Sequence, residues 1–177
     1  LPDEQLEQVN TLRKELAELT ADFDRNIAQD NRSITVAHED LEGLGDDLIA
    51  TLKTTDDGMY VLGVDYPTYF RVMENCSVAD TRKKLYLAFN NRGYPANEEL
   101  LKTIITKRDD LAHLLGYIDY AHCDIDSQMA HTPERARAFI NDLTQRAATK
   151  TNSEMATLTA QLPDSVTLTE DGKIQPW

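Results

Sequence analysis

The sequence has little cysteine and no long apolar run. Its two cysteines, Cys76 and Cys123, are too few for a disulfide framework, and a chain of 177 residues can bury a core without one. We therefore expect reduced thiols and a cytoplasmic protein. No stretch approaches the roughly 18 uncharged apolar residues that a membrane-spanning helix needs. The sequence thus predicts no transmembrane segment.

Positive charge is scarce. The 18 lysines and arginines stand against 31 aspartates and glutamates, which gives a formal net charge of −13. An acidic surface repels phosphate groups, so the charge argues against nucleic acid and anionic membranes as partners. We interpret it as a solubility feature, with steering of cationic ligands as the alternative. The sequence begins at Leu1 without a signal-peptide pattern, and we expect a trimmed N-terminus.

Residues 1–30 predict one long helix, because their apolar residues recur at steps of three and four. Charged and polar residues fill the positions between them. Such a stripe is typical of a helix that faces a core. A coiled-coil seam to a partner is the alternative, although three heptads are few for an independent coiled coil. The stripe consists of Leu6, Val9, Leu12, Leu16, Leu19, Phe23 and Ile27.

The segment 31–65 combines short strands with a helical stretch. Ser33–Val36 is β-branched, and the turn signal Asp56-Asp57-Gly58 precedes a second apolar run, Met59–Val64. Between them, Glu39–Leu52 has a helical pattern that two glycines interrupt. We predict that the two strands form a small antiparallel β element, which must pack on flanking helices.

Residues 66–150 are predicted to be helical. Pro67 suits the first turn of one helix, Ser77 with Asp80 resembles a capping box, and Asn97 begins a further helix. We expect an aromatic group at helical spacing to pack in the core rather than to bind a peptide. That group is Tyr66, Tyr69 and Phe70.

The last part of the chain has a clear helix start and an uncertain end. Thr132-Pro133-Glu134 is an N-terminal signal, whereas residues 151–177 are predicted to be irregular or a strand, with Val166–Thr169 as the strand. We find no linker, so residues 1–177 are expected to form a single helical domain. The helix after Thr132 is predicted to bury Ala136, Phe139, Ile140 and Leu143.

A metal site must be considered, because three histidines and a cysteine lie within twenty residues: His113, His122, Cys123 and His131. Zinc sites usually contain tight pairs such as CxxC or HxxxH, which are missing here. His38-Glu39 begins like a metallopeptidase motif, but position 42 is Glu42, and no HExxH occurs in the chain. We therefore interpret these histidines as ordinary surface or hydrogen-bonded residues.

Other catalytic patterns are also incomplete. Neither cysteine has nearby the combined lysine–histidine pattern that would mark a reactive thiolate, and no glycine-rich phosphate loop is present. Carboxylate pairs such as Asp109-Asp110 carry little signal among 31 acidic residues. Asp124 and Asp126 are not followed by the glycine and glutamate of a calcium loop. On motifs alone, the chain is a helical domain that binds or supports something.

Five stretches stand out in their order along the chain: Tyr66–Cys76, Thr81–Gly93, Asn97–Tyr117, Thr132–Leu143 and Lys173–Trp177. Together they resemble the thimet oligopeptidase family of zinc metallopeptidases. The resemblance spans most of the chain and is strongest over residues 66–143. It implies a mostly helical body split by a deep channel, in which an HExxH helix and a downstream glutamate hold zinc.

The resemblance further implies that this chain is the N-terminal part of such an enzyme, upstream of the zinc-binding helix, and that it helps to build one channel wall. The family's zinc ligands, general-base glutamate and substrate-binding residues all lie beyond position 177. We therefore expect no catalytic, cofactor-binding or metal-binding residue in this chain. Zinc and short peptide substrates are expected only in the longer parent.

The sequence thus predicts a mostly α fold with one long N-terminal helix and a small antiparallel β element. The predicted function is the channel-wall part of a hydrolase that cleaves short peptides, inactive alone. Its predicted partner is the catalytic half of the same polypeptide, and we expect a monomer. One alternative is a non-enzymatic, acidic helical interaction module. The other is a small metalloprotein that uses His113, His122, Cys123 and His131.

Overall fold

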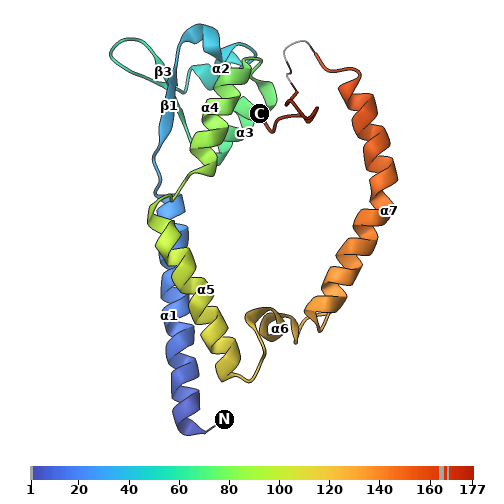
Figure 1. Ribbon diagram of the computed structural model, residues 1–177. Coiled ribbons are helices and arrows are strands. Elements are labelled where there is room, and N and C mark those ends of the chain that lie inside the picture. Colours follow the sequence, from blue (N-terminus) through green and yellow to red (C-terminus); the bar gives the residue numbers. More distant parts are fainter. Residues whose placement is uncertain (1, 164–165, 167) are drawn as a thin grey trace. The chain divides into compact units, whose positions relative to one another are not determined.

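The computed structural model describes residues 2–163, 166 and 168–177. These residues are mostly helical and include one small antiparallel sheet, which confirms the predicted fold class (Figure 1). The elements in chain order are α1 (Asp3–Ala28), β1 (Ser33–Val36), the 3-10 helix η1 (His38–Leu41), α2 (Asp46–Ile49), β2 (Lys53–Thr54), β3 (Tyr60–Gly63), α3 (Tyr66–Asn75), α4 (Ala79–Asn90), α5 (Ala96–Leu114), α6 (Tyr120–Ile125) and α7 (Pro133–Thr159).

The chain divides into two compact units. The first unit comprises Leu1–Ala28 with Tyr94–Ala156, and the second unit comprises Gln29–Gly93 with Thr157–Trp177. Each unit therefore brings together segments that are far apart in the sequence. None of the described helices is both long and apolar enough to cross a membrane.

The second unit is built on a three-stranded antiparallel sheet in the order β1-β3-β2. The predicted pairing of the first and second apolar runs is confirmed, with Ile34 opposite Leu62 and Val36 opposite Tyr60. β2 was not predicted, since a two-residue strand leaves no periodic pattern. It adds Lys53 and Thr54 to the other edge of β3.

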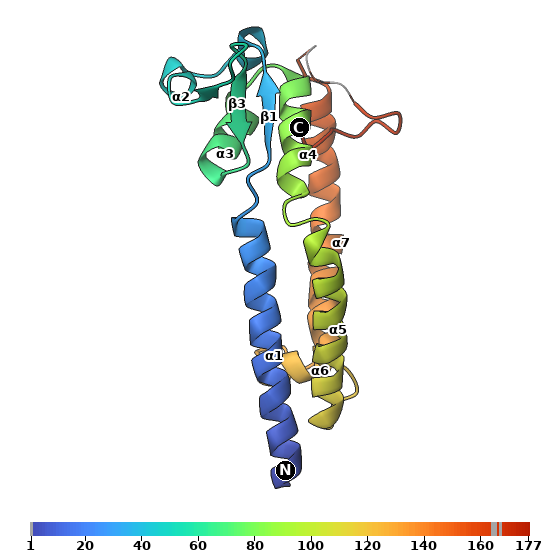
Figure 2. The same ribbon diagram turned by 90° about the vertical axis from the view of Figure 1, so that its left-hand side faces the viewer.

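Two helices bury the apolar side chains of this sheet. α3 packs on β3 and α4 packs on β1, as Figure 2 shows. Leu62 of β3, Val72 of α3 and Leu85 of α4 are completely buried in the resulting core. The other buried members of this core are Val36, Leu41, Leu44, Leu48, Val64, Tyr69 and Cys76.

The predicted capping box at Ser77 and Asp80 is wrong. The Ser77 backbone nitrogen and hydroxyl both donate to the carbonyl oxygen of Glu42, at 2.8 and 3.1 Å. The serine therefore joins the chain after η1 to the end of α3. α4 begins two residues later, with Val78 as the N-cap residue, and Asp80 forms an ion pair with Lys84 instead.

The first unit is organised around α1 and α5, which run antiparallel and side by side in both views (Figures 1 and 2). Val9 of α1 and Ile104 of α5 are buried. The buried Asn97 side chain donates to the Phe23 carbonyl oxygen at 3.0 Å and accepts from Asn26 at 2.8 Å. The apolar stripe of α1 therefore packs in part within this chain: Val9 is buried, whereas Leu6 is 47% exposed.

α7 differs from its prediction in two ways. It remains helical over residues 151–159, for which irregular structure or a strand was predicted, because no glycine or proline interrupts residues 134–162. None of its residues is buried. The predicted buried face is therefore wrong for this chain: Phe139, Ile140 and Leu143 are exposed and Ala136 is half-buried, since no other described element covers them.

The C-terminal tail forms a small turn. Leu168 and Ile174 make an antiparallel bridge, and the Thr169 nitrogen donates to the Lys173 carbonyl oxygen at 2.8 Å. Residues 164, 165 and 167 lie outside the described part of the chain, and with them one position of the predicted strand. The ring of Trp177 lies near the ring of Tyr86 on α4, and the two ring centroids are 5.5 Å apart.

Candidate functional site

The structure does not bring the candidate metal ligands together. Among the described residues, no group of three or more His, Cys, Asp or Glu side chains could hold a metal ion. His113 instead pairs with Asp109 one turn earlier on α5, at 3.4 Å. His131 lies at a positive backbone φ of 62°, with its ring Nδ1 3.1 Å from the Asp126 carbonyl oxygen. These two histidines serve local structure.

His122 has the most elaborate surroundings of the four histidines. Asp119 is the N-cap residue of α6 and accepts a hydrogen bond from the His122 backbone nitrogen at 2.9 Å. The same carboxylate lies 2.8 Å from the His122 ring Nδ1. On the other side of the ring, Nε2 lies 3.5 Å from the carboxylate of Glu134 in the first turn of α7. His122 therefore links α6 to the start of α7.

The two carboxylates determine how His122 titrates. The hydrogen bond with Asp119 raises the pKa of His122, and the negative charge of Glu134 acts in the same direction. The backbone and ring nitrogens of His122 correspondingly lower the pKa of Asp119. The arrangement favours an imidazolium between two carboxylates, which is a structural ion pair rather than a general base.

We expect the His122 pKa to lie above its ordinary value of 6.5. Because the pKa is raised in the folded state, protonated His122 stabilises the α6–α7 junction fully below about pH 6.5, and this stabilisation is lost as the pH rises through the folded pKa. NMR titration of the imidazole ring would measure this. Asp119→Asn should lower the pKa, whereas Asp109→Asn, beside His113, should leave it unchanged. A wild-type pKa at or below 6.5 would contradict the expectation.

Both cysteines are free thiols with the properties of structural residues. Burial raises the pKa of Cys76, whose sulfur lies 3.5 Å from the Asp40 carbonyl oxygen. Burial also raises the pKa of Cys123, and the neighbouring Asp124 adds to the effect. A raised pKa keeps each thiol protonated near neutral pH, so neither cysteine has the character of a nucleophile.

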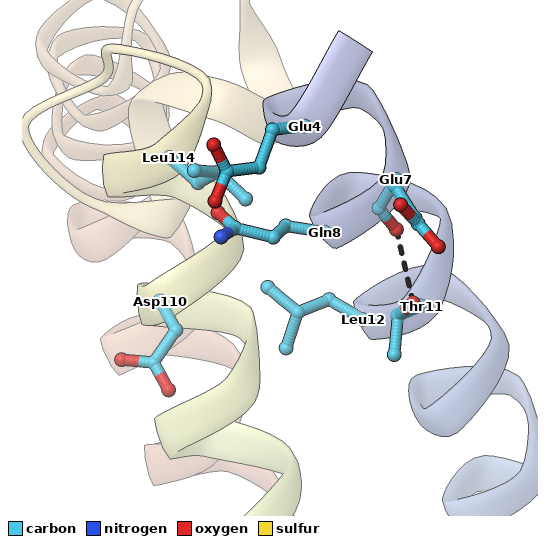
Figure 3. A pocket seen from close by; sticks show the side chains of 7 residues that line it. All are labelled: Glu4, Glu7, Gln8, Thr11, Leu12, Asp110 and Leu114. Carbon is cyan, nitrogen blue, oxygen red and sulfur yellow. Dashed lines mark hydrogen bonds between the residues drawn. The ribbon is translucent and has the colours of Figure 1, made fainter.

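A surface pocket of about 590 Å³ lies between α1 and α5 in the first unit. Figure 3 shows Gln8 and Leu12 pointing from α1 toward α5. Its polar lining is acidic, because three of its seven residues carry carboxylates and none carries a positive charge. The pocket can therefore attract a cation, but it contains no histidine or cysteine for nucleophilic chemistry. The lining residues are Glu4, Glu7, Gln8, Thr11, Leu12, Asp110 and Leu114.

The aromatic group of α3 is only partly in the core. Tyr69 is buried and stacks on Phe89 of α4, with ring centroids 3.7 Å apart. The guanidinium carbon of Arg92 lies 3.6 Å from the Phe89 centroid on this aromatic stack. Tyr66 and Phe70 are at least half exposed, so the prediction that they pack in the core is wrong. Tyr66 and Phe70 lie one turn apart on the side of α3 that faces solvent. Tyr69 faces the core instead.

The sequence model of peptidase family M3 matches residues 72–177. The chain belongs to peptidase family M3. Saccharolysin from Saccharomyces cerevisiae is 32% identical over 77% of this chain and 20% of its own length. Oligopeptidase A from Salmonella typhimurium is 28% identical over all of this chain and 28% of its own length. The probable thimet oligopeptidase from Arabidopsis thaliana is 26% identical over 77% of this chain and 19% of its own length.

These relatives confirm the resemblance to oligopeptidases, since two of the three carry that word in their names. This M3 chain spans 19% to 28% of the lengths of the three relatives. The zinc implied by the resemblance finds no suitable donor set among the described residues.

Sequence reasoning missed the Asp119–His122–Glu134 arrangement and the short helix α6. A signal was present, because aspartate is a preferred N-cap residue. Its carboxylate can accept a hydrogen bond from the backbone nitrogen three residues later, as Asp119 does from His122. Six residues were too few to show helical periodicity. The approach of Glu134 depends on tertiary structure and left no sequence pattern.

Proposed function

We propose that this chain is the N-terminal, channel-wall part of a zinc-dependent oligopeptidase that hydrolyses short peptides. The observation that carries the proposal is the M3 family match over residues 72–177. The relatives named oligopeptidase and saccharolysin support it, since more than two thirds of their length has no counterpart in this chain. The parts that bind zinc and perform chemistry would lie in that remaining length.

In this proposal, the chain contributes shape and charge rather than reacting groups. The 177 residues contain no HExxH, so they supply neither the zinc ligands nor the glutamate base of that motif. The helical scaffold and the excess of carboxylates would form part of the wall that a peptide passes. Zinc supplies the polarisation of the peptide carbonyl and activates the attacking water in such enzymes. We further propose that the protein is a monomer and that it lies in the cytoplasm, a reducing compartment, which the two free thiols support.

The interaction-module alternative has lost its main support. Its argument was the stripe of α1, but α1 packs along α5, and Lys107 of α5 forms an ion pair with Glu15 of α1 at 2.7 Å. Val9 of this stripe is buried and most of its other residues are half-buried, which leaves less of the seam for a coiled-coil partner, although Leu6 is 47% exposed. The metalloprotein alternative has no donor set among the described residues.

A peptidase assay tests the proposal directly. The longest natural polypeptide that contains these residues should cleave a quenched fluorescent peptide of about ten residues and should fail to cleave a folded protein. Treatment with 1,10-phenanthroline should abolish cleavage, and Zn²⁺ should restore it, because the metal activates the water. The 177-residue chain should show no cleavage with or without Zn²⁺.

Two results would contradict the proposal. One is peptide cleavage by the 177-residue chain itself, which would require a reacting group within it. The other is a natural polypeptide that contains these residues, binds no zinc and leaves peptides intact. A stoichiometric zinc on the 177-residue chain that is lost in His122→Ala would instead favour the metalloprotein alternative.

A further inference from the structure

α7 presents three large apolar side chains to solvent on one side. Phe139 is 68% exposed, Ile140 59% and Leu143 57%. They are spaced by one, three and four residues, which places them together on a helix surface. We call Phe139, Ile140 and Leu143 the α7 apolar face. A single exposed leucine is ordinary, but three adjacent large apolar residues on a helix without any buried residue require a partner.

The rest of this part of α7 is polar and arranged for water. Arg146 forms an ion pair with Asp142 at 2.9 Å, and both side chains are mostly exposed. Further along, Lys150 pairs with Glu154 at 3.5 Å and ends the apolar stretch. In proteins, most of the stability of a helix comes from the packing of an amphipathic face on another element. The pattern is therefore that of an amphipathic helix whose apolar side is made to be covered.

The area of the face argues against a second copy as its partner. A stable association of separate molecules usually buries about 800 Å² on each partner. An aromatic side chain buries about 150–250 Å² at most, so three side chains fall short of that area. The net charge of −13 also opposes self-association. A covalently linked partner needs less area, because no translational freedom is lost on docking.

The family match identifies a linked partner. The M3 family match includes all of α7, so α7 belongs to the body that the family shares. The relatives extend this body by a length that is more than twice that of the matching region. A face that is uncovered here therefore has a large amount of chain available to cover it within one polypeptide.

We propose that the α7 apolar face docks against the remainder of the M3 polypeptide, on an apolar surface that accepts one aromatic and two aliphatic side chains. The proposal rests on the proposed function, because it needs a longer M3 enzyme. In that enzyme, α7 joins this part of the wall to the catalytic part. The sequence pattern that predicts burial of Phe139, Ile140 and Leu143 then describes the assembled enzyme.

Hydrogen exchange and a matched pair of variants test this proposal. Leu143→Asp places a carboxylate in the α7 apolar face, whereas Gln145→Asp places the same group about 200° around the helix, away from that face. In the 177-residue chain, both variants should leave the melting temperature unchanged. In the longer polypeptide, the α7 amides should be protected, and Leu143→Asp should speed their exchange by roughly tenfold or more, the effect of losing one buried leucine. Gln145→Asp should not.

The outcomes separate this proposal from the proposed function. Equal exchange of α7 in the short chain and in a peptide-cleaving long polypeptide would overturn docking and leave the function intact. Protection of α7 in a long polypeptide that never cleaves peptides would support docking and overturn the proposed function. A dimer of the 177-residue chain that Leu143→Asp dissociates would assign the face to a second copy and overturn the proposal. If Leu143→Asp prevents folding of the longer polypeptide, exchange in the wild type and in Leu143→Ala decides.

Discussion

Leu85→Ala is expected to lower the unfolding free energy of the second unit by about 2–5 kcal/mol, one of the larger effects of any single substitution in this protein. Leu85 lies on α4, is completely buried and contributes to the core that α3, α4 and the sheet share. Removing its three outer carbons loses their burial and leaves a cavity, because neighbouring backbone from three elements cannot collapse into it.

Leu87 on the same helix provides the matched control. It is 47% exposed, so Leu87→Ala makes the same chemical change with little cavity, and the expected loss is within about 0.5 kcal/mol. Urea denaturation followed by circular dichroism would measure both variants against the wild type. A loss for Leu85→Ala no greater than that for Leu87→Ala would show that this core is not closely packed.

Gly43→Ala is expected to destabilise the second unit strongly for a different reason. Gly43 has a φ of +90°, and a Cβ there would collide with the Asn75 carbonyl oxygen and lie 3.0 Å from the Ser77 nitrogen. The backbone cannot move away freely, because the Ser77 nitrogen and hydroxyl both hold the Glu42 carbonyl oxygen. Relief of the collision therefore requires the loss of hydrogen bonds that join η1 to α3.

Gly58→Ala separates the two components of this effect. Gly58 also has a positive φ, +80°, but an added Cβ meets nothing within 4 Å. It should cost only the left-handed backbone penalty of about 1–2 kcal/mol. Gly43→Ala should cost about 1–3 kcal/mol more, the usual effect of overpacking. Thermal unfolding of the two variants would measure the difference. Equal losses would mean that the contact between Gly43 and residues 75–77 is loose.

The fold could be predicted where its signals are local. The stripe of α1, the proline in the first turn of α3 and the β-branched runs of β1 and β3 each depend on residues within one segment. Prediction failed where a segment distant in the sequence provides the hydrogen-bond partner of a residue. The capping box at Ser77 failed because Glu42, 35 residues earlier, accepts the serine's hydrogen bonds.

The candidate site was less predictable than the fold. The sequence placed His113, His122, Cys123 and His131 close together in the chain, but the three histidines have separate partners, Asp109, Asp119 and Asp126. The carboxylate pair around His122 was missed, because Glu134 reaches the ring from the next helix. The family membership was predictable, since it rests on an ordered series of short stretches rather than on any one contact.

The sequence by itself determined the long N-terminal helix, the strands β1 and β3, and the family that the chain resembles. These properties follow from local spacing along the chain. Only the tertiary structure decided which apolar sides meet. The stripe of α1 is partly covered by α5, and the side chain of Leu85 is buried in the core that it shares with the sheet. The face of Phe139, Ile140 and Leu143 is covered by no described residue. Burial is a relation between distant segments, so periodicity predicts a face that is suited to burial but does not identify what covers it.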